Sequence, residues 1–273
     1  ASVCSARLVI LDQSEYNLYR IEEELSERFP NVTLSPVLGD VCDVVAMQHI
    51  FARYKPTAVF HAAAYKHVPL LEGQVREAVR NNVFGTKQVA DLAHSSGVEK
   101  FVLISTDKAV NPSSLMGACK RAAEIYIQQL APQSETTFIT VRFGNVLGSA
   151  GSVVPKFQEQ IKRGGPVTVT HPEMTRYFMT ITEASQLILE ASAMGEGGRI
   201  YVLDMGLPVL ISDLAEQLIQ LSGKEVHKDI RIVYTGLRAG EKLHEELFHT
   251  DENLSDTDYE KIHLAATRTI DSQ

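Results

Sequence analysis

The sequence predicts an α/β fold built on a doubly wound parallel sheet, and two observations predict it. Short apolar runs alternate with amphipathic segments through the first half of the chain, which is the pattern of consecutive strand–helix–strand units. The 273 residues are 44% apolar, enough to bury a large core as one domain or as two lobes. After Asn145 the pattern changes, so we expect the sheet domain over residues 1–147 and a smaller lobe over residues 148–273.

The expected elements follow from the spacing of apolar residues. Short apolar runs bounded by polar segments predict strands at residues 7–11, 32–37, 58–60, 100–104, 137–142, 199–203 and 230–234. Apolar residues that recur every three or four positions predict helices at residues 14–29, 44–54, 75–95, 114–130, 153–162, 182–194 and 212–221. The final stretch, residues 251–273, is polar and is expected to pack poorly.

Composition and charge exclude several classes of protein. The formal net charge of −8 argues against a nucleic-acid partner, although a local basic pocket would still admit an anionic nucleotide. Cys4, Cys42 and Cys119 lack Cys-x-x-Cys spacing, which indicates reduced thiols in a cytoplasmic protein and no metal site. No apolar run approaches the ~18 residues that span a bilayer, so we expect a soluble chain without a signal peptide.

The opening of the chain is unusual for a Rossmann-like sheet. Such sheets begin with a strand and a Gly-rich turn that binds the pyrophosphate of a dinucleotide. Residues 1–38 contain no glycine, and the chain starts almost directly at what we expect to be the second strand. Either the fold never had this turn or the sequence begins downstream of it. We favour the second explanation and expect the first strand and its turn to precede residue 1.

An acid and a base stand side by side after the apolar run of residues 100–104. Thr106, Asp107 and Lys108 therefore fall at the carboxyl end of a buried parallel strand, where open α/β sheets bind their ligands. An Asp-Lys dipeptide is most often a solvated turn. The motifs around this one instead indicate a pair that moves protons on and off one substrate.

Two acidic residues at strand ends predict contacts with an adenosine. Asp12 closes the first expected strand, where a carboxylate accepts hydrogen bonds from ribose hydroxyls and repels a 2′-phosphate. This position favours NAD over NADP, and the same side chain can also cap the following helix. Asp40 and Val41 follow the next expected strand, where an acceptor can meet the adenine amino group, although an aspartate in a turn is common.

Small and polar residues follow the strand expected at residues 58–60. The alanine run at 62–64 lets a flat cofactor approach the backbone, and Lys66 can face a phosphate. Asn81 and Asn82 lie inside an expected helix, where each costs up to about 1 kcal/mol relative to alanine. At least one of them is therefore expected to bond across to a neighbouring strand.

Several long strings together resemble one known family. The helix after Thr106 carries Met116-x-x-x-Lys120, where the extended short-chain dehydrogenase/reductase superfamily has Tyr-x-x-x-Lys. The strings HAAAYKHVPLLE, STDKAVNP, RFGNVLGSAGSVVPKF, TRYFMT and RAGEKLHEEL resemble its UDP-N-acetylglucosamine 4,6-dehydratases of bacterial polysaccharide synthesis. Met in place of Tyr is similar to their large, membrane-anchored members. The match runs from about residue 7 to residue 248, without that family's Gly-rich turn and membrane region.

The resemblance and the residue patterns assign three sets of residues. The catalytic set is Thr106, Asp107, Lys108, Met116 and Lys120. The NAD set is Asp12, Asp40, Val41, Ala62, Ala63, Ala64, Tyr65, Asn81, Ser105 and Lys120. The set for the UDP-sugar is Lys66, Asn145, Ser152, Val153, Phe157, Thr168, Arg176, Arg238 and Glu241. The two arginines would clamp phosphate with their forked guanidinium groups, unless each forms a surface ion pair.

The family implies a reaction of three steps. Hydride leaves carbon 4 of the sugar for NAD⁺, water is then lost across carbons 5 and 6, and hydride returns to carbon 6. Lys108 would be the base at carbon 5 and Asp107 the acid at carbon 6, so Lys108 must be neutral and Asp107 protonated for part of the cycle. Met116 cannot accept the proton of the carbon 4 hydroxyl, which leaves ionised Asp107 or a bound water.

Two other functions stay open. A UDP-N-acetylglucosamine 4-epimerase would share fold, cofactor and substrate, but has no use for an acid–base pair at carbons 5 and 6. A nucleotide-sugar-binding domain without turnover fits the missing turn and the missing Tyr. The family also implies a homo-oligomer that pairs through helices 75–95 and 114–130, and a cytoplasmic location, with any membrane anchor upstream of residue 1.

Overall fold

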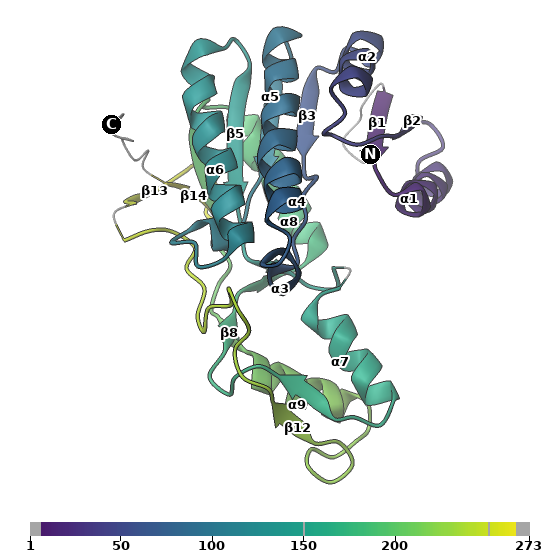
Figure 1. Cartoon of the computed structure of the whole chain (residues 1–273), viewed down its shortest axis with the longest axis vertical. Helices are drawn as coiled ribbons and strands as arrows, with labels where there is room; N and C mark the ends of the chain where they lie inside the picture. The colour runs from purple at the N-terminus through teal and green to yellow at the C-terminus, as the bar shows by residue number, and fades with distance from the viewer. Residues whose placement is uncertain (1–6, 150, 251, 266–273) are drawn as a thin grey trace.

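The computed structural model describes residues 7–149, 151–250 and 252–265, and its centre is a six-stranded sheet in the order β13-β14-β10-β5-β4-β3 (Figure 1). Four strands run parallel, namely β3 (Ala58–His61), β4 (Lys100–Ile104), β5 (Thr137–Arg142) and β10 (Arg199–Leu203). Beyond β10, the antiparallel strands β14 (Ile262–Ala265) and β13 (Leu254–Asp256) complete the edge. The predicted parallel sheet is therefore confirmed, with an antiparallel edge that was not predicted.

Helices pack on both faces of this sheet because strand side chains alternate between the faces. The helices on one face are α2 (Val44–Tyr54), α5 (Thr86–Ser95) and α6 (Leu115–Leu130), and α8 (Ile181–Met194) covers the other. Within β4, Phe101 and Leu103 enter the first core and Val102 enters the second. Burial on both faces explains the continuous apolar run that predicted this strand.

The first elements form a unit beside the six-stranded sheet. β1 (Arg7–Asp12) and β2 (Thr33–Leu38) pair with each other in parallel, and α1 (Glu15–Arg28) connects them. The side chain of Ser14 caps α1 by accepting a hydrogen bond from the backbone N–H of Asn17 at 3.3 Å. This unit follows the predicted strand–helix–strand order.

The helix expected over residues 75–95 contains one wider turn. α4 (Val75–Val79) continues through a π-helical turn at Arg80–Gly85 into α5. The side chain of Asn82 accepts a hydrogen bond from the backbone N–H of Tyr65 and donates one to the carbonyl of Tyr65, both at 2.8 Å. Asn82 therefore makes a bond across to another segment, as expected of one of the two asparagines, but its partner lies in the loop that follows β3 and not in a strand.

The lobe has a hydrophobic core of its own. Its main elements are α7 (Val153–Lys162), β7 (Val167–Val169), α9 (Ile211–Leu221) and β12 (Ile232–Tyr234). Phe157, Val167 and Ile219 lie in this core. The remaining short elements are α3 (Val68–Leu71), β6 (Asn145–Val146), β8 (Thr175–Arg176), β9 (Phe178–Met179) and β11 (Val209–Leu210).

The end of the chain corrects one expectation. Residues 252–265 are not poorly packed, because β13 and β14 join the sheet and bury Ile262 and Ala265. These strands are only three or four residues long and include the polar residues Ser255, Asp256 and His263, so no apolar run marked them. Residues 251 and 266–273 lie outside the described residues. The sheet therefore contains strands from before residue 147 (β3, β4 and β5) and from after it (β10, β13 and β14), so the sheet domain is not confined to residues 1–147.

Two features of the described residues, their cysteines and the length of their helices, bear on the predicted thiols and membrane spans. Cys42 and Cys119 are free thiols, as predicted, and Cys4 lies outside the described residues. In the part of the chain that the structure describes, no helix is both long and apolar enough to cross a bilayer.

A buried ionic network lies behind the ends of β4 and β5. Arg142 is 1% exposed and donates two hydrogen bonds to Glu124 of α6, both at 2.7 Å, and one to Glu252 at 2.8 Å. Ser105, directly after β4, donates to Glu124 at 2.6 Å. Burial alone would raise the pKa of Glu124, but the bonds from Arg142 and Ser105 reverse this effect and lower it.

We predict that Arg142→Met destabilises the fold by about 3–5 kcal/mol, because it leaves the buried Glu252 without its cation and Glu124 with Arg121 as its one remaining cation among the described residues. Arg163→Met is the matched control, since Arg163 pairs with Glu159 in solvent and should cost at most about 1 kcal/mol. Equilibrium unfolding in urea measures both. Equal losses in the two variants would contradict the role given to the buried network.

Candidate active site

A cavity of about 720 Å³ lies between the carboxyl edge of the sheet and the lobe. Both parts of the chain line it, which is the position that open α/β sheets use for ligands. The sequence-predicted residues on its wall are Ala62, Ala64, Tyr65, Lys66, Ser105, Thr106, Lys108, Met116, Lys120, Asn145, Ser152, Val153, Phe157, Thr168, Arg176, Arg238 and Glu241. The predicted residues that are not on its wall are Asp12, Asp40, Val41, Ala63, Asn81 and Asp107.

The Thr-Asp-Lys segment turns directly after β4. Asp107 is completely buried, and its Oδ1 accepts hydrogen bonds from the hydroxyl of Thr106 at 2.8 Å and from the ammonium of Lys108 at 2.9 Å. Thr106 and Lys108 reach the cavity wall, whereas Asp107 lies behind them. Its Oδ2 has no hydrogen-bond partner among the described residues. Asp107 and Lys108 are thus in contact with each other, but of the two only Lys108, the proposed base, faces the cavity.

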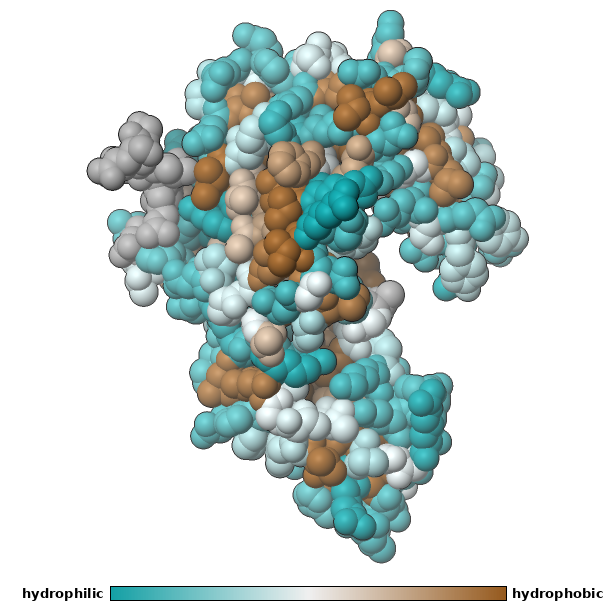
Figure 2. Space-filling model, in the orientation of Figure 1, coloured by the Kyte–Doolittle hydropathy of each residue, from teal (hydrophilic) through white to brown (hydrophobic). Residues whose placement is uncertain are grey.

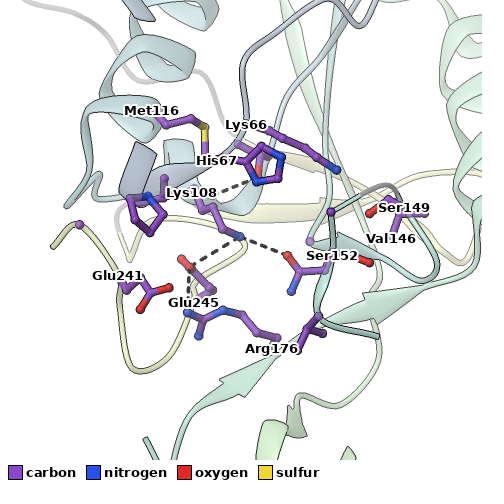
Figure 3. A pocket seen from close by; sticks show the side chains of 18 of the residues that line it. Lys66, His67, Lys108, Met116, Val146, Ser149, Ser152, Arg176, Glu241 and Glu245 are labelled. Atoms are coloured by element: carbon purple, nitrogen blue, oxygen red, sulfur yellow. Dashed lines mark hydrogen bonds and ion pairs between the residues drawn. The ribbon is translucent and has the colours of Figure 1, made fainter. Parts of the chain in front are cut away.

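The ammonium of Lys108 is surrounded by oxygen atoms. Besides Asp107, it lies 3.3 Å from Oδ1 of Asn145 and 3.6 Å from Oε1 of Glu245, and Figure 3 shows the line from Lys108 through Glu245 to Arg176. Glu245 was not predicted as a site residue. Its neighbour Glu246 has the same chemistry, so the sequence offered no signal to choose between them.

A glycine fixes the distance between this segment and α6. A Cβ on Gly117 would lie 2.2 Å from the carbonyl oxygen of Lys108, a clash that excludes any residue with a side chain unless the backbone moves. The helix therefore touches the backbone of the segment directly, and Ser114 caps it by accepting a hydrogen bond from Gly117 N–H at 3.1 Å.

Met116 and Lys120 lie one turn apart on the cavity face of α6, as the spacing predicts. Met116 is 4% exposed and packs with Leu71, Ala78 and Cys119. Lys120 is also buried and donates a hydrogen bond to the carbonyl of Ile104 at 2.5 Å. Burial lowers the pKa of Lys120 to about 8, although Glu124 opposes the shift.

The residues predicted to bind a dinucleotide fall into two groups. Ala62, Ala64 and Ser105 line the cavity together with Lys120, although the hydroxyl of Ser105 donates to Glu124. The two alanines have the small side chains that were expected to let a flat ring approach the backbone. Asp12 ends β1 and accepts a hydrogen bond from the backbone N–H of Ser14 at 2.7 Å, whereas the cap of α1 is Ser14 itself and not Asp12 as the alternative interpretation expected.

The other expected cofactor contacts are engaged within the protein. Asp40 forms a 2.7 Å ion pair with Arg80 and accepts a hydrogen bond from the backbone N–H of Cys42 at 2.8 Å. Partial burial would raise the pKa of Asp40, but these two partners lower it. Val41 belongs to the core of the sheet domain, and the Asn81 side chain donates to Asn82.

The cavity wall is rich in cations. Lys156, Arg176 and Arg238 line it from the lobe and Lys66 from the loop after β3, in a protein whose net charge is negative. Burial lowers the pKa of Lys66, and burial together with Arg238 lowers that of Lys156. Lys156 was missed, although its neighbours Val153 and Phe157 on the same helix were assigned to the UDP-sugar. Such a wall suits a diphosphate.

The two arginines differ in how they are held. Arg176 donates to the backbone carbonyls of Thr175, Lys242 and Leu243 at 2.6–3.1 Å, so its guanidinium anchors a chain segment. Arg238 is more exposed and donates to Oε1 of Glu241 at 2.5 and 3.1 Å. Arg238 is therefore the freer of the two to meet an incoming anion.

Of the other residues predicted to contact the UDP-sugar, Thr168 and Phe157 contact the protein itself, whereas the hydroxyl of Ser152 does not form a hydrogen bond among the described residues. The hydroxyl of Thr168 accepts a hydrogen bond from the side chain of Gln160 at 2.8 Å, and Phe157 lies in the core of the lobe. The hydroxyl of Ser152 is buried without a hydrogen-bond partner among the described residues. That hydroxyl lies on the cavity wall, so a ligand group there would satisfy it.

Comparison with known proteins gives consistent matches. Residues 2–267 match the model of a family described as polysaccharide biosynthesis protein. The capsular polysaccharide biosynthesis protein CapD of Staphylococcus aureus is 54% identical over 259 residues, which cover 94% of this chain and 43% of that protein. This chain therefore spans less than half the length of that relative.

Two further relatives carry names of enzymes. The UDP-N-acetylglucosamine 4,6-dehydratase (inverting) of Campylobacter jejuni is 33% identical over 255 residues, covering 90% of this chain and 71% of that protein. The UDP-glucose 4-epimerase of Rickettsia canadensis is 34% identical over 251 residues, covering 89% of this chain and 72% of that protein.

Solved structures support the same fold. Pen from Bacillus thuringiensis superposes with a TM-score of 0.86 at 35% identity, covering 95% of this chain and 80% of that chain. The dTDP-glucose 4,6-dehydratase DesIV from Streptomyces venezuelae, solved with NAD and TYD, gives a TM-score of 0.79 at 21% identity, covering 90% and 80%.

The buried amine of Lys120 predicts a pH dependence of stability. An unfolded lysine has a pKa of about 10.4, so between pH 8 and 10 the unfolded chain binds a proton that the folded chain does not. The contribution of Lys120 to the free energy of unfolding should therefore rise with pH in this window, by at most about 1.4 kcal/mol per pH unit.

Urea unfolding of the wild type and of Lys120→Met measures this contribution. The difference in unfolding free energy should be constant from pH 6 to 7 and should move in favour of the wild type from pH 8 to 10. A difference that does not change with pH would show that Lys120 stays charged in the folded protein.

Proposed function

The chain belongs to the polysaccharide biosynthesis protein family, and from that premise we propose that it is an NAD-dependent dehydratase of UDP-N-acetylglucosamine. Its product would be a UDP-4-keto-6-deoxy-N-acetylhexosamine for bacterial surface polysaccharide. The observation that carries the proposal is Lys108, a base held by Asp107 and Asn145 on the wall of a cavity rich in cations. The Campylobacter relative supports this substrate and this reaction.

The residues for the cofactor are those whose surroundings fit a dinucleotide. Asp12 would hold the adenosine ribose, and Ala62, Ala64 and Lys120 would hold the nicotinamide riboside. NAD, when bound, supplies the acceptor and later the donor of a hydride. The buried amine of Lys120 would donate to the ribose hydroxyls while it keeps its bond to the carbonyl of Ile104.

The cations of the lobe would bind the substrate's diphosphate. Lys156 and Arg238 are the best placed, because Arg176 is already engaged by three carbonyls. Asn145 would stand between the diphosphate and the sugar, since its side-chain oxygen also contacts Lys108 at 3.3 Å. The sugar would therefore lie over Lys108, with the uracil further into the lobe near Thr168.

Proton transfer would be divided between Lys108 and Asp107. Lys108 faces the cavity and would remove the proton from carbon 5, and Thr106 would bind the oxygen at carbon 4. Asp107 is proposed as the acid for the carbon 6 hydroxyl. Because its carboxyl group lies behind the wall, its proton would travel through the hydrogen-bonded side chain of Thr106 or Lys108.

A UDP-sugar 4-epimerase is the second candidate, and the Rickettsia relative supports it at 34% identity, against 33% for the Campylobacter dehydratase. An epimerase needs oxidation and reduction at carbon 4 alone. A base held at 2.9 Å from a buried carboxylate is not needed for that reaction, so the contact between Lys108 and Asp107 favours dehydration.

The protein is further proposed to form homo-oligomers in the cytoplasm. Val75 and Phe84 are 57% and 59% exposed, and they line a shallow groove on α4 and the π-helical turn. Figure 2 shows this apolar stripe along the middle of the viewed face. A second copy that covers the stripe would remove this apolar surface from water.

The test is mass spectrometry of UDP-N-acetylglucosamine after incubation with the protein and NAD⁺. We predict the loss of one water, and that Lys108→Ala abolishes this loss by removing a base worth about 10²–10⁴ in rate. Lys162→Ala, at an exposed position on α7, is the control and should dehydrate as the wild type does. An unchanged mass with altered chromatographic mobility would instead support the epimerase, and near-normal dehydration by Lys108→Ala would remove Lys108 from the mechanism.

A further inference from the structure

One irregular segment, residues 238–246, joins the lobe to the sheet domain, and we call it the clasp. On the lobe side it receives hydrogen bonds from Arg176, on the carbonyls of Lys242 and Leu243. On the sheet side, Lys242 donates to the carbonyl of Val110 at 2.9 Å and Ser113 donates to that of Gly240 at 3.3 Å. The clasp therefore touches the loop that follows Lys108.

Glu245 is the buried carboxylate of the clasp. It is 7% exposed and lines the cavity. Its Oε1 lies 3.6 Å from Nζ of Lys108 and 3.7 Å from Nη2 of Arg176, and Figure 3 shows it between the two cations. Its Oε2 has no hydrogen-bond partner among the described residues.

The energetics of this arrangement call for an explanation. A buried carboxylate is strongly unfavourable unless cations and donors compensate it. Both distances from Oε1 exceed those of good hydrogen bonds, so the compensation here is ionic attraction to two cations at once. A substitution of Glu245 would therefore act first on Lys108 and Arg176.

Lys108 depends on three oxygens that come from different parts of the chain. Asp107 belongs to the turn after β4 and Asn145 to β6, both at the carboxyl edge of the sheet, whereas Glu245 belongs to the clasp. A lysine side chain has a flexible four-carbon stem, and contacts from several directions are needed to hold its amine at one place. Glu245 of the clasp therefore contacts the amine of Lys108 from a part of the chain different from the one that carries Asp107 and Asn145.

We propose that Glu245 is a positioning residue for Lys108. It holds the amine at the cavity wall and, through Arg176, ties that position to the docking of the lobe. The role rests on the proposed function insofar as Lys108 is the base of the reaction. The contact itself can be tested without any turnover.

Three variants separate the possibilities. Glu245→Gln keeps the shape and removes the charge, and Glu245→Asp keeps the charge on a shorter stem. Glu246→Gln is the matched control, because Glu246 is its neighbour, is partly exposed, and bonds Asn111 and Lys242 without touching Lys108. Unfolding in urea shows for each variant whether the fold is retained.

The first measurement is the rate at which a small acylating reagent modifies Lys108, read by peptide mass spectrometry against the exposed Lys162. Glu245→Gln should raise the relative rate several-fold, Glu245→Asp less, and Glu246→Gln not at all. Equal labelling of Lys108 in the wild type and Glu245→Gln would overturn the proposal. This result does not depend on the substrate, so it stands even if the wild type does not dehydrate UDP-N-acetylglucosamine.

The second measurement is steady-state dehydration by the same variants. Glu245→Gln should lower kcat by about tenfold or more while KM for the UDP-sugar stays within about threefold, because misplaced catalytic groups cost rate and not affinity. Glu245→Asp should recover part of kcat. A rise in KM at constant kcat would overturn the proposal and make Glu245 a substrate contact.

Discussion

The pairing of Arg142 with Glu124 is the interaction on which the site depends most. It joins β5 to α6, Ser105 adds the end of β4, and Glu252 adds the segment before β13. These elements carry every side chain proposed for proton transfer. Charges so deeply buried are stable only when each has its partner, so the network permits one arrangement of the strand ends and the helix. The position of the cavity wall formed by these strand ends and by α6 therefore depends on the network.

Local patterns were enough to predict the part of the site built on the sheet. Thr106 and Lys108 were found because an apolar run ends just before them, and Met116 and Lys120 because helical spacing places them on one face. Glu245 and the edge strands β13 and β14 could not be found in this way. Glu245 meets Lys108 across more than a hundred residues, and the edge strands are short and half polar.

The cavity shows how an acidic protein can receive an anionic ligand. The cations that line it come from α6, α7, β8 and three connecting segments, and only the fold brings them together. Carboxylates such as Glu241 and Glu245 hold some of these cations in place. Burial lowers the pKa of Lys120 to about 8, so this one amine on the wall is close to its charge transition near neutral pH. The wall thus combines cations that suit a phosphate with an amine that can lose its proton.

The central claim is that one molecule of sugar is oxidised, dehydrated and reduced within this cavity. The most direct measurement follows a deuterium placed at carbon 4 of UDP-N-acetylglucosamine into the product by NMR. We predict that the label appears at carbon 6 of the 4-keto product, because the hydride leaves and returns without meeting solvent. Deuterium that stays at carbon 4 of an epimer, or that is lost to water, would contradict the account.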